Sequence, residues 1–414
     1  MDYIVIGGGV SGLSIANILQ KSGNKVTVFE KEGQPGGLIR CQHVDGSLFH
    51  QTGGHVFNTK REDVLTWFWS FFSRDTQFHK ANRNSIIMMD GGKEIPYPIE
   101  NHLYMLDEKV GQSAIQDFIN RAINPHFSAD NFEDFLKRTF GQTLYELYFR
   151  PYNEKIWRKS LNDVPLSWLE GKLPMPTVQE VMFNNIFRVK ENAFVHSSFF
   201  YPNRGGSQFI ADTLAHGLDI RYGNMVEHME RRGQGWLVNG EEADAVIFCG
   251  NVKQLPKMLS GCISLSDYQE TIEDLPSHGT TSVFCEIQEN PYSWIYLPVH
   301  DYEAHRIICT GNFSPNNNGK GKMTATIEFT DYINYDEIIG QLARIPLKPR
   351  YLTHHYAEYT YPIQTSNTRK LINALKETLM PHNVFLLGRF AEWEYYNMDA
   401  AMGAAIDLSG KIQE

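Results

Sequence analysis

The sequence predicts an α/β fold built from three parts, and three patterns along the chain support this prediction. The first is a short β-branched run, Met1–Ile6, followed at once by a glycine turn and an apolar-periodic helix over 13–22. The second is a helical composition with few glycines over 112–188, and the third is a series of alternating strands over 280–361. Together they predict a Rossmann-like domain, a helical insertion and a mostly antiparallel sheet.

The glycine turn after the first strand has the spacing of a phosphate-binding loop. Gly7 allows a tight turn, Gly9 lets the backbone approach a pyrophosphate, and Gly12 lets the helix pack close to the strand. A second strand over 25–29 ends on Glu30, whose carboxylate can accept both ribose hydroxyls. The positive end of the helix dipole then faces the phosphates. The whole pattern predicts a dinucleotide site.

The stretch after the acidic residue favours FAD over NAD. Residues 31–40 read KEGQPGGLIR and contain a glycine doublet. This run resembles the large FAD oxidoreductase group that includes amine oxidases, protoporphyrinogen oxidase and UDP-galactopyranose mutase, in which the doublet and a nearby arginine touch the FAD diphosphate. The resemblance implies FAD, with Lys31, Gly37 and Leu38 among its binding residues. The alternative is an ordinary glycine turn with a solvated arginine.

Composition sets bounds on partners and location. A formal net charge of -10 argues against nucleic acid or an acidic membrane surface as the main partner. The five cysteines are scattered and form no CxxC or Cys/His cluster, so we expect reduced thiols and no metal site. No apolar run approaches the ~18 residues of a membrane span, and the sequence opens on a strand. We therefore expect a soluble, cytoplasmic protein without a signal peptide.

A run of small residues precedes His55. Residues 51–57 read QTGGHVF, which marks a place where backbone passes something bulky. The run resembles UDP-galactopyranose mutases, where this loop lies against the isoalloxazine ring, so Gly54 and His55 are implied to touch the flavin. Further along, Val226 falls where this FAD group holds the adenine through backbone hydrogen bonds. A loop histidine satisfied by local contacts is the alternative for His55.

Two segments that resemble the same mutases indicate a substrate cleft. A PYP run fixes an extended backbone that presents Tyr97, and the resemblance adds Glu100 to the cleft. The run YFRPYNEKIW resembles a mutase signature in which Asn153 and Trp157 reach the nucleotide sugar. Apolar residues over 115–123 fall on one face of a predicted helix. Aromatic residues at helical spacing are otherwise more often core residues, which remains the alternative.

The C-terminal part ends the last predicted strand on a Gly-Arg pair and continues into a helix of small residues. Its run GRFAEWEYYNMD closely resembles UDP-galactopyranose mutases, where this junction meets the flavin. A helix N-terminus aimed at the flavin stabilises the anionic reduced form. The resemblance implies flavin contacts from Gly388, Arg389, Asn397 and Met398, substrate contacts from Tyr361 and Tyr395, and catalysis by His55, Arg389 and Asn397.

Seven such segments occur in the order found in the UDP-galactopyranose mutase group and together span essentially the whole chain. The resemblance implies a nucleotide-sugar mutase in which N5 of reduced FAD attacks the anomeric carbon, with NADH or NADPH as reductant, in cell-surface polysaccharide biosynthesis. The family holds the substrate diphosphate with two arginines, whereas counting along this chain places Lys172 and Gln288 there. The sugar and the oligomeric state stay open, and a homo-oligomer is one option.

Two further functions stay open beside the mutase. One is an FAD-dependent oxidoreductase of the amine or protoporphyrinogen oxidase type, which needs an apolar pocket and consumes oxygen. The other is a flavoprotein whose FAD is structural and serves in assembly. Turnover of nucleotide sugars by reduced protein would separate the mutase from both.

A chain of 414 residues is long enough for two or three domains. We expect a discontinuous FAD-binding domain made of 1–95, 189–265 and 371–414. Residues 96–188 would form a helical substrate-cleft domain, and 266–370 the antiparallel sheet domain.

Overall fold

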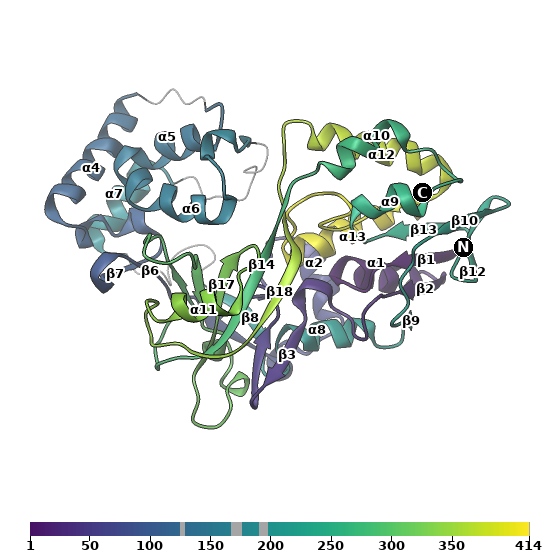
Figure 1. The fold of residues 1–414 in the computed structure, drawn as a ribbon, viewed down its shortest axis with the longest axis horizontal. Coiled ribbons are helices and arrows are strands. Elements are labelled where there is room, and N and C mark those ends of the chain that lie inside the picture. Colours follow the sequence, from purple (N-terminus) through teal and green to yellow (C-terminus); the bar gives the residue numbers. More distant parts are fainter. Residues whose placement is uncertain (125–128, 167–175, 190–197, 414) are drawn as a thin grey trace.

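The computed structural model describes residues 1–124, 129–166, 176–189 and 198–413. Within these ranges the chain forms a parallel sheet, a separate and mostly antiparallel sheet, and a block of helices. This arrangement confirms the predicted α/β class. In Figure 1 the helical block and the parallel sheet lie on opposite sides of the molecule, and the long strands of the second sheet lie between them.

The parallel sheet has the order β19-β13-β1-β2-β9, and every neighbouring pair is parallel. Its strands are β1 (Asp2–Ile6), β2 (Lys25–Phe29), β9 (Asp219–Arg221), β13 (Ala245–Phe248) and β19 (Val384–Leu386). The flanking helices are α1 (Val10–Lys21), α8 (Gly206–Ala215), α9 (Leu255–Met258), α10 (Ser266–Glu273), α12 (Thr368–Leu379) and α13 (Met398–Gln413). Val5, Val28 and Ile247 are fully buried between the sheet and α1. Because parallel strands are covered on both faces, they read as continuous apolar runs.

The second sheet has the order β18-β14-β17-β16-β15-β6-β7 and is antiparallel except where β15 meets β6. Its strands are β6 (Ser85–Met88), β7 (Glu94–Pro96), β14 (Ser277–Glu286), β15 (Trp294–Tyr296), β16 (Arg306–Ile308), β17 (Thr324–Thr330) and β18 (Arg350–Pro362), with α11 (Tyr335–Leu342) packed beside them. The expected boundary at residue 95 groups β6 and β7 with the FAD-binding domain, whereas the structure pairs them with this sheet. The domain limits themselves stay a prediction.

The helical block contains α4 (Glu108–Ile123), α5 (Phe132–Leu144), a π-helical turn (Tyr145–Phe149), α6 (Arg150–Trp157) and α7 (Val178–Phe187). Smaller elements connect the layers: α2 (Glu62–Trp69), α3 (Arg74–Gln77), and the antiparallel groups β3 (Cys41–Val44) with β4 (Ser47–His50), β5 (Phe78–Asn82) with β8 (Ser198–Pro202), and β10 (Met229–Arg232) with β11 (Gly235–Val238) and β12 (Glu241–Ala243).

The buried face of α4 differs from the one that the apolar periodicity suggests. Ala114 and Phe118 are buried, whereas Ile115, Ile119 and Ile123 are 40%, 42% and 69% exposed. The helix is therefore turned so that a small residue and one phenylalanine meet the block. Periodicity identifies the helix but not which of its apolar residues face the core.

Candidate functional site

The first glycine turn joins β1 to α1. Gly7 has a φ of +112°, which favours glycine, and its N–H donates to the Phe29 carbonyl over 2.8 Å. A Cβ added to Gly12 would lie 1.9 Å from the Gly7 carbonyl oxygen, so only glycine lets the helix come this close. The helix begins at Val10, after Gly9 as its N-cap. The N–H groups of its first turn can therefore serve a phosphate.

Glu30 lies at the end of β2, directly beside this turn. Its side chain is buried, and its carboxylate accepts the N–H of Gly8 over 2.6 Å and the N–H of Glu32 over 2.9 Å. This is the edge of the turn at which an acidic residue can meet a ribose. Lys31 is exposed and pairs with Glu32 over 3.7 Å, so its contact with a cofactor stays a prediction.

The glycine doublet packs directly on the first turn. Gly36 donates its N–H to the Gly8 carbonyl over 2.8 Å and has a φ of +117°. Gly37 has a φ of +55°, and a Cβ added to it would lie 3.2 Å from the Gly9 Cα. A side chain at Gly37 would separate the two loops, and one at Gly36 would meet Ala211, so the glycines create a bare backbone surface beside the helix N-terminus.

The loop over 52–55 is fixed by hydrogen bonds from three other segments. Its bonds run from Thr52 Oγ1 to the Leu38 carbonyl (2.8 Å), from the Gly53 N–H to Glu328 Oε1 (2.8 Å) and from the His55 N–H to His50 Nδ1 (3.2 Å). A Cβ added to Gly54 would lie 2.8 Å from the Ile308 Cγ2 atom. The loop thus lies between the glycine doublet and the second sheet, without room to shift toward either.

The ring of His55 has an unusual environment. Its Nε2 atom is buried and has no hydrogen-bond partner in the part of the chain that the structure describes. Burial, with the nearby charge of Arg389, lowers the pKa of His55 to about 4, so the ring is neutral at pH 7. A buried polar atom without a partner is rare, and a catalytic role or a bound group is among its explanations. The residues present therefore fit a flat polar cofactor at this loop.

The last strand brings a third glycine to the turn. Gly388 has a φ of +108°, and a Cβ added to it would lie 2.9 Å from the Ser11 Oγ atom in the first turn of α1. The next residue, Arg389, donates to the carbonyls of Thr360 over 3.0 Å and of Tyr396, and its guanidinium lies 4.6 Å from the centroid of the Tyr395 ring. Its bonding partners within the described ranges are carbonyls, so no carboxylate neutralises its charge there.

The start of α13 lies next to Arg389. Met398 is buried, while Asn397 is exposed and its carbonyl accepts the N–H of Ala401 over 2.9 Å. The structure thus places both predicted residues at the helix N-terminus, where the dipole is positive. Whether they touch a flavin stays a prediction.

A cluster of tyrosines and arginines continues from Arg389 into the second sheet. Tyr395 stacks on Tyr361 with ring centroids 5.6 Å apart and an interplanar angle of 9°. Arg306 donates to the Tyr361 hydroxyl over 3.0 Å and is also bonded to Glu328. The Arg306 side chain is 20% exposed, so part of the guanidinium can reach a ligand. Tyr361 and Tyr395, both predicted from the sequence, therefore lie together with a cation that sequence reasoning missed.

A third guanidinium lies on the far side of this cluster. Arg83 is bonded to the Tyr296 hydroxyl and lies 5.4 Å from the centroid of the Tyr97 ring. Tyr296 also meets Tyr97 and Tyr152, with centroids 5.0 and 5.5 Å apart. Burial raises the pKa of Tyr152, and the charge of Arg306 opposes that rise, which links the two halves of the cluster. Tyr97 is thus the predicted residue at this end.

Other predicted substrate residues lie deeper in the helical block. Trp157 is 5% exposed within its core, and the Asn153 amide donates to the Phe149 carbonyl over 2.7 Å. Glu100 is 4% exposed, and burial raises the pKa of its carboxyl to about 7. Lys172 lies outside the described residues. These four assignments therefore stay predictions.

Two further residues lie outside the tyrosine cluster. Val226 is buried in the loop after β9, next to the parallel sheet. Gln288 is exposed beyond the end of β14, and its N–H donates to the Leu347 carbonyl over 2.9 Å. Tyr361 pairs with His278 at the opposite end of that strand, about ten residues or roughly 33 Å away. Gln288 therefore lies away from Tyr361, beside which Arg306 provides a cation, and its contact with a substrate diphosphate stays a prediction.

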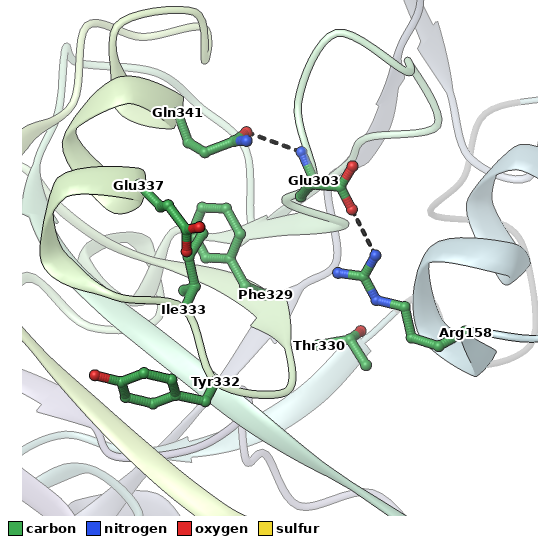
Figure 2. Close-up of a pocket in the computed structure, with 8 residues that line it drawn as sticks. All are labelled: Arg158, Glu303, Phe329, Thr330, Tyr332, Ile333, Glu337 and Gln341. Carbon is green, nitrogen blue, oxygen red and sulfur yellow. Dashed lines mark hydrogen bonds and ion pairs between the residues drawn. The ribbon is translucent and has the colours of Figure 1, made fainter.

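The cavity drawn in Figure 2 is separate from this site. Its volume is about 240 Å³, and it lies between the end of α6 and α11. Arg158 and Glu303 form an ion pair of 2.5 Å at its rim, and Gln341 accepts the Glu303 N–H over 2.9 Å. None of the residues predicted for cofactor or substrate lines it.

The described residues supply three further facts about the chemistry. No group of three or more His, Cys, Asp or Glu side chains among them could hold a metal ion. None of the helices in the described ranges is long and apolar enough to cross a membrane. All five cysteines have free thiols.

Comparison with known proteins gives matches over the full length of the chain. The profile of the family described as flavin containing amine oxidoreductase matches residues 10–298. The UDP-galactopyranose mutase of Mycoplasma pneumoniae is 24% identical over an alignment of 430 residues, gaps included, that covers 98% of this chain and 94% of that protein. The mutase of Mycoplasma genitalium is 22% identical over an alignment of 445 residues, gaps included, that covers 99% of this chain and 94% of that protein.

Among solved structures, a crystal structure of reduced UDP-galactopyranose mutase has a TM-score of 0.86 and 20% identity, covering 100% of this chain and 93% of that chain. At this identity the likeness establishes the fold. The matches confirm the resemblance to the mutase group that the sequence motifs indicated. Since the family profile spans well over half of the sequence, including α1 and the His55 loop, the chain belongs to the flavin-containing amine oxidoreductase family.

Proposed function

We propose that this chain is an FAD-dependent nucleotide-sugar mutase of the UDP-galactopyranose mutase type. The observation that carries the proposal is a line of contacts that runs from the glycine turns through the 52–55 loop and Glu328 to Arg306, and from there through Tyr361 and Tyr395 to Arg389. This line joins a cofactor wall to a cationic, aromatic cleft. Full-length relatives that are UDP-galactopyranose mutases support the same reading.

FAD is the cofactor that the glycine turns and the family favour. The bare backbone beside the helix N-terminus suits a diphosphate, and the neutral ring of His55 can bond to a flat heterocycle. In the proposed reaction the nucleophile for the anomeric carbon comes from the bound, reduced flavin. The residues proposed to hold FAD are Gly7, Gly9, Gly12, Glu30, Lys31, Gly37, Leu38, Gly54, His55, Val226, Gly388, Arg389, Asn397 and Met398.

The chain's own groups would bind and orient the sugar nucleotide. Arg306 and Arg389 would neutralise the diphosphate, which assists its departure as a leaving group. The stacked pair of Tyr361 and Tyr395 offers flat faces and hydroxyl groups at the same place. Glu100, whose pKa burial raises to about 7, could hold or release a proton near neutral pH.

The remaining substrate residues follow from the resemblance. Tyr97, Asn153 and Trp157 would contact the nucleotide and Lys172 the diphosphate. We further propose that NADH or NADPH reduces the flavin, that the enzyme works in the cytoplasm, and that its product enters cell-surface polysaccharide synthesis. Lys172→Ala should weaken binding of the true nucleotide sugar by about ten- to a hundredfold, the cost of one charge-assisted contact.

Turnover by reduced protein tests the proposal. Purified protein is reduced with dithionite and incubated with a panel of UDP-hexoses, and the ring forms are separated by chromatography. We expect interconversion for at least one sugar with reduced protein and none with oxidised protein. Arg306→Gln should abolish it, whereas Arg350→Gln, on an exposed side chain of β18, should not. No conversion of any sugar by reduced, flavin-loaded protein would contradict the proposal.

An oxidoreductase of the amine or protoporphyrinogen oxidase type is the second candidate. The family to which the chain belongs carries that activity in its description. The polar lining of the cleft, with two guanidiniums and stacked tyrosines, suits an anionic substrate better than an apolar one. Steady oxygen uptake with amines or porphyrinogens, in the absence of sugar conversion, would favour this candidate.

A further inference from the structure

Glu328 is an isolated buried carboxylate in the second sheet. It lies in the strand β17, whose sequence TATIEFT is otherwise uncharged, and its side chain is 1% exposed. Burying a charge is costly unless partners compensate it. Burial raises its pKa, but the charge of Arg306 and hydrogen bonds from His305 and Arg306 outweigh this and hold the pKa well below its usual range. The group is therefore ionised in the folded protein.

The two oxygens of Glu328 bind two different parts of the site. Oε1 accepts the Gly53 N–H over 2.8 Å, in the loop that leads to His55. Oε2 binds the Arg306 guanidinium and lies 3.5 Å from His305 Nε2. Gly53 has a φ of +66° and belongs to no strand, so strand pairing does not hold its backbone in place. One carboxylate thus joins the proposed cofactor loop to the proposed anion-binding side chain.

Arg306 in turn reaches Tyr361, and Arg389 lies near His55. Two guanidiniums therefore share this region with one ionised carboxylate, while burial keeps His55 neutral at pH 7. Removing Glu328 would leave two positive charges and release both Gly53 and Arg306. Positional and electrostatic effects would then change together.

We propose that Glu328 is a positioning residue that holds the His55 loop and Arg306 in one arrangement and offsets one of the two positive charges beside the flavin. The inference rests on the proposed function only where it places Arg306 next to an anionic substrate. Its remaining part needs only a bound flavin. The role is distinct from catalysis, because Glu328 reaches the reacting groups through Gly53 and Arg306.

The test measures the flavin midpoint potential in holoprotein variants. Glu328→Gln removes a negative charge and should raise the potential, whereas Arg306→Gln removes a positive charge and should lower it. The double variant Arg306→Gln/Glu328→Gln restores the balance and should return close to the wild-type value. Glu286→Gln is the matched control, since that carboxylate lies in the same sheet and pairs with Lys322 and Arg350.

Hydrogen exchange supplies the positional readout. In Glu328→Ala the Gly53 amide loses its acceptor, so exchange over 51–57 should accelerate at least tenfold, and Glu286→Ala should leave it unchanged. If Glu328→Gln does not fold, the flavin midpoint potential of the double variant is compared with that of Arg306→Gln instead. The double variant should then have the higher midpoint potential. Unchanged potentials, or a double variant as displaced as either single one, would overturn the inference. Neither readout requires turnover, so a failed mutase assay would leave it standing.

Discussion

The pH dependence of stability should depend strongly on His50. This residue ends β4, is fully buried, and contacts the His55 N–H through Nδ1 over 3.2 Å and the Tyr201 hydroxyl through Nε2 over 2.7 Å. Burial, with the nearby His55, lowers the pKa of His50 to about 3. Burial, with the nearby charge of Arg389, lowers the pKa of His55 to about 4. Because Nδ1 accepts the backbone N–H, the proton of the neutral ring is on Nε2. Both rings are therefore uncharged in the folded protein near neutral pH.

The size of the effect follows from the unfolded chain. There a histidine has a pKa of about 6.5, so between pH 7 and pH 5 it gains a proton that the folded protein cannot accept. The unfolded state binds more protons over this window, and stability falls as the pH falls. Each of the two histidines then costs the folded state about 2 kcal/mol at pH 5 relative to pH 7. This value is insensitive to the folded pKa as long as that pKa lies below 5.

The assay compares urea unfolding of holoprotein at pH 7 and pH 5, followed by tryptophan fluorescence. His50→Asn keeps an acceptor for the His55 N–H but cannot take up the proton, so its loss of stability between the two pH values should be smaller by about 2 kcal/mol. The control is His216→Asn, because His216 is exposed, and its loss should equal that of the wild type. An identical loss in wild type and His50→Asn would refute the reasoning.

Three other changes follow from single contacts. Gly12→Ala should prevent flavin retention, because the added Cβ would lie 1.9 Å from a carbonyl oxygen of the turn. The control Gly33→Ala, whose Cβ would meet nothing within 4 Å, should retain the flavin. Flavin absorbance after gel filtration measures both. Lys155→Met should lower stability by about 3 kcal/mol in urea at pH 6, because the ammonium donates to three backbone carbonyls, two of them buried. Tyr361→Phe removes the acceptor of Arg306 and should weaken UDP binding about tenfold in a fluorescence titration, with flavin still bound.

The parts of the site that could be predicted are those fixed by local backbone geometry. The first turn needs a positive φ at Gly7 and no side chain at Gly12, and both requirements are visible in the sequence as glycines. The same holds for Gly388, whose φ of +108° brings the last strand onto α1. Such constraints act over a few residues, so sequence spacing reports them directly.

The residues that sequence reasoning missed depend on strand pairing. Arg306 and Glu328 face each other because β16 and β17 are antiparallel neighbours in that register. A shift of either strand by one residue would turn its side chain to the opposite face of the sheet and separate the pair. The same dependence on strand pairing applies to Gln288, because counting along β14 leads to the end of the strand away from Tyr361. A lone acidic residue in the apolar run TATIEFT was the available signal for Glu328.

The whole chain carries a net negative charge, whereas the cluster of Arg306, Arg389 and Glu328 carries a net positive one. The net charge of -10 repels any anionic ligand at long range, but salt screens that repulsion beyond about 8 Å at physiological ionic strength. Beside the stacked tyrosines lie Arg306 and Arg389, of which only Arg306 is bonded to a carboxylate in the described ranges. The surplus positive charge therefore lies where burial makes it most effective. This local surplus of positive charge would favour an anionic ligand beside Tyr361 and Tyr395.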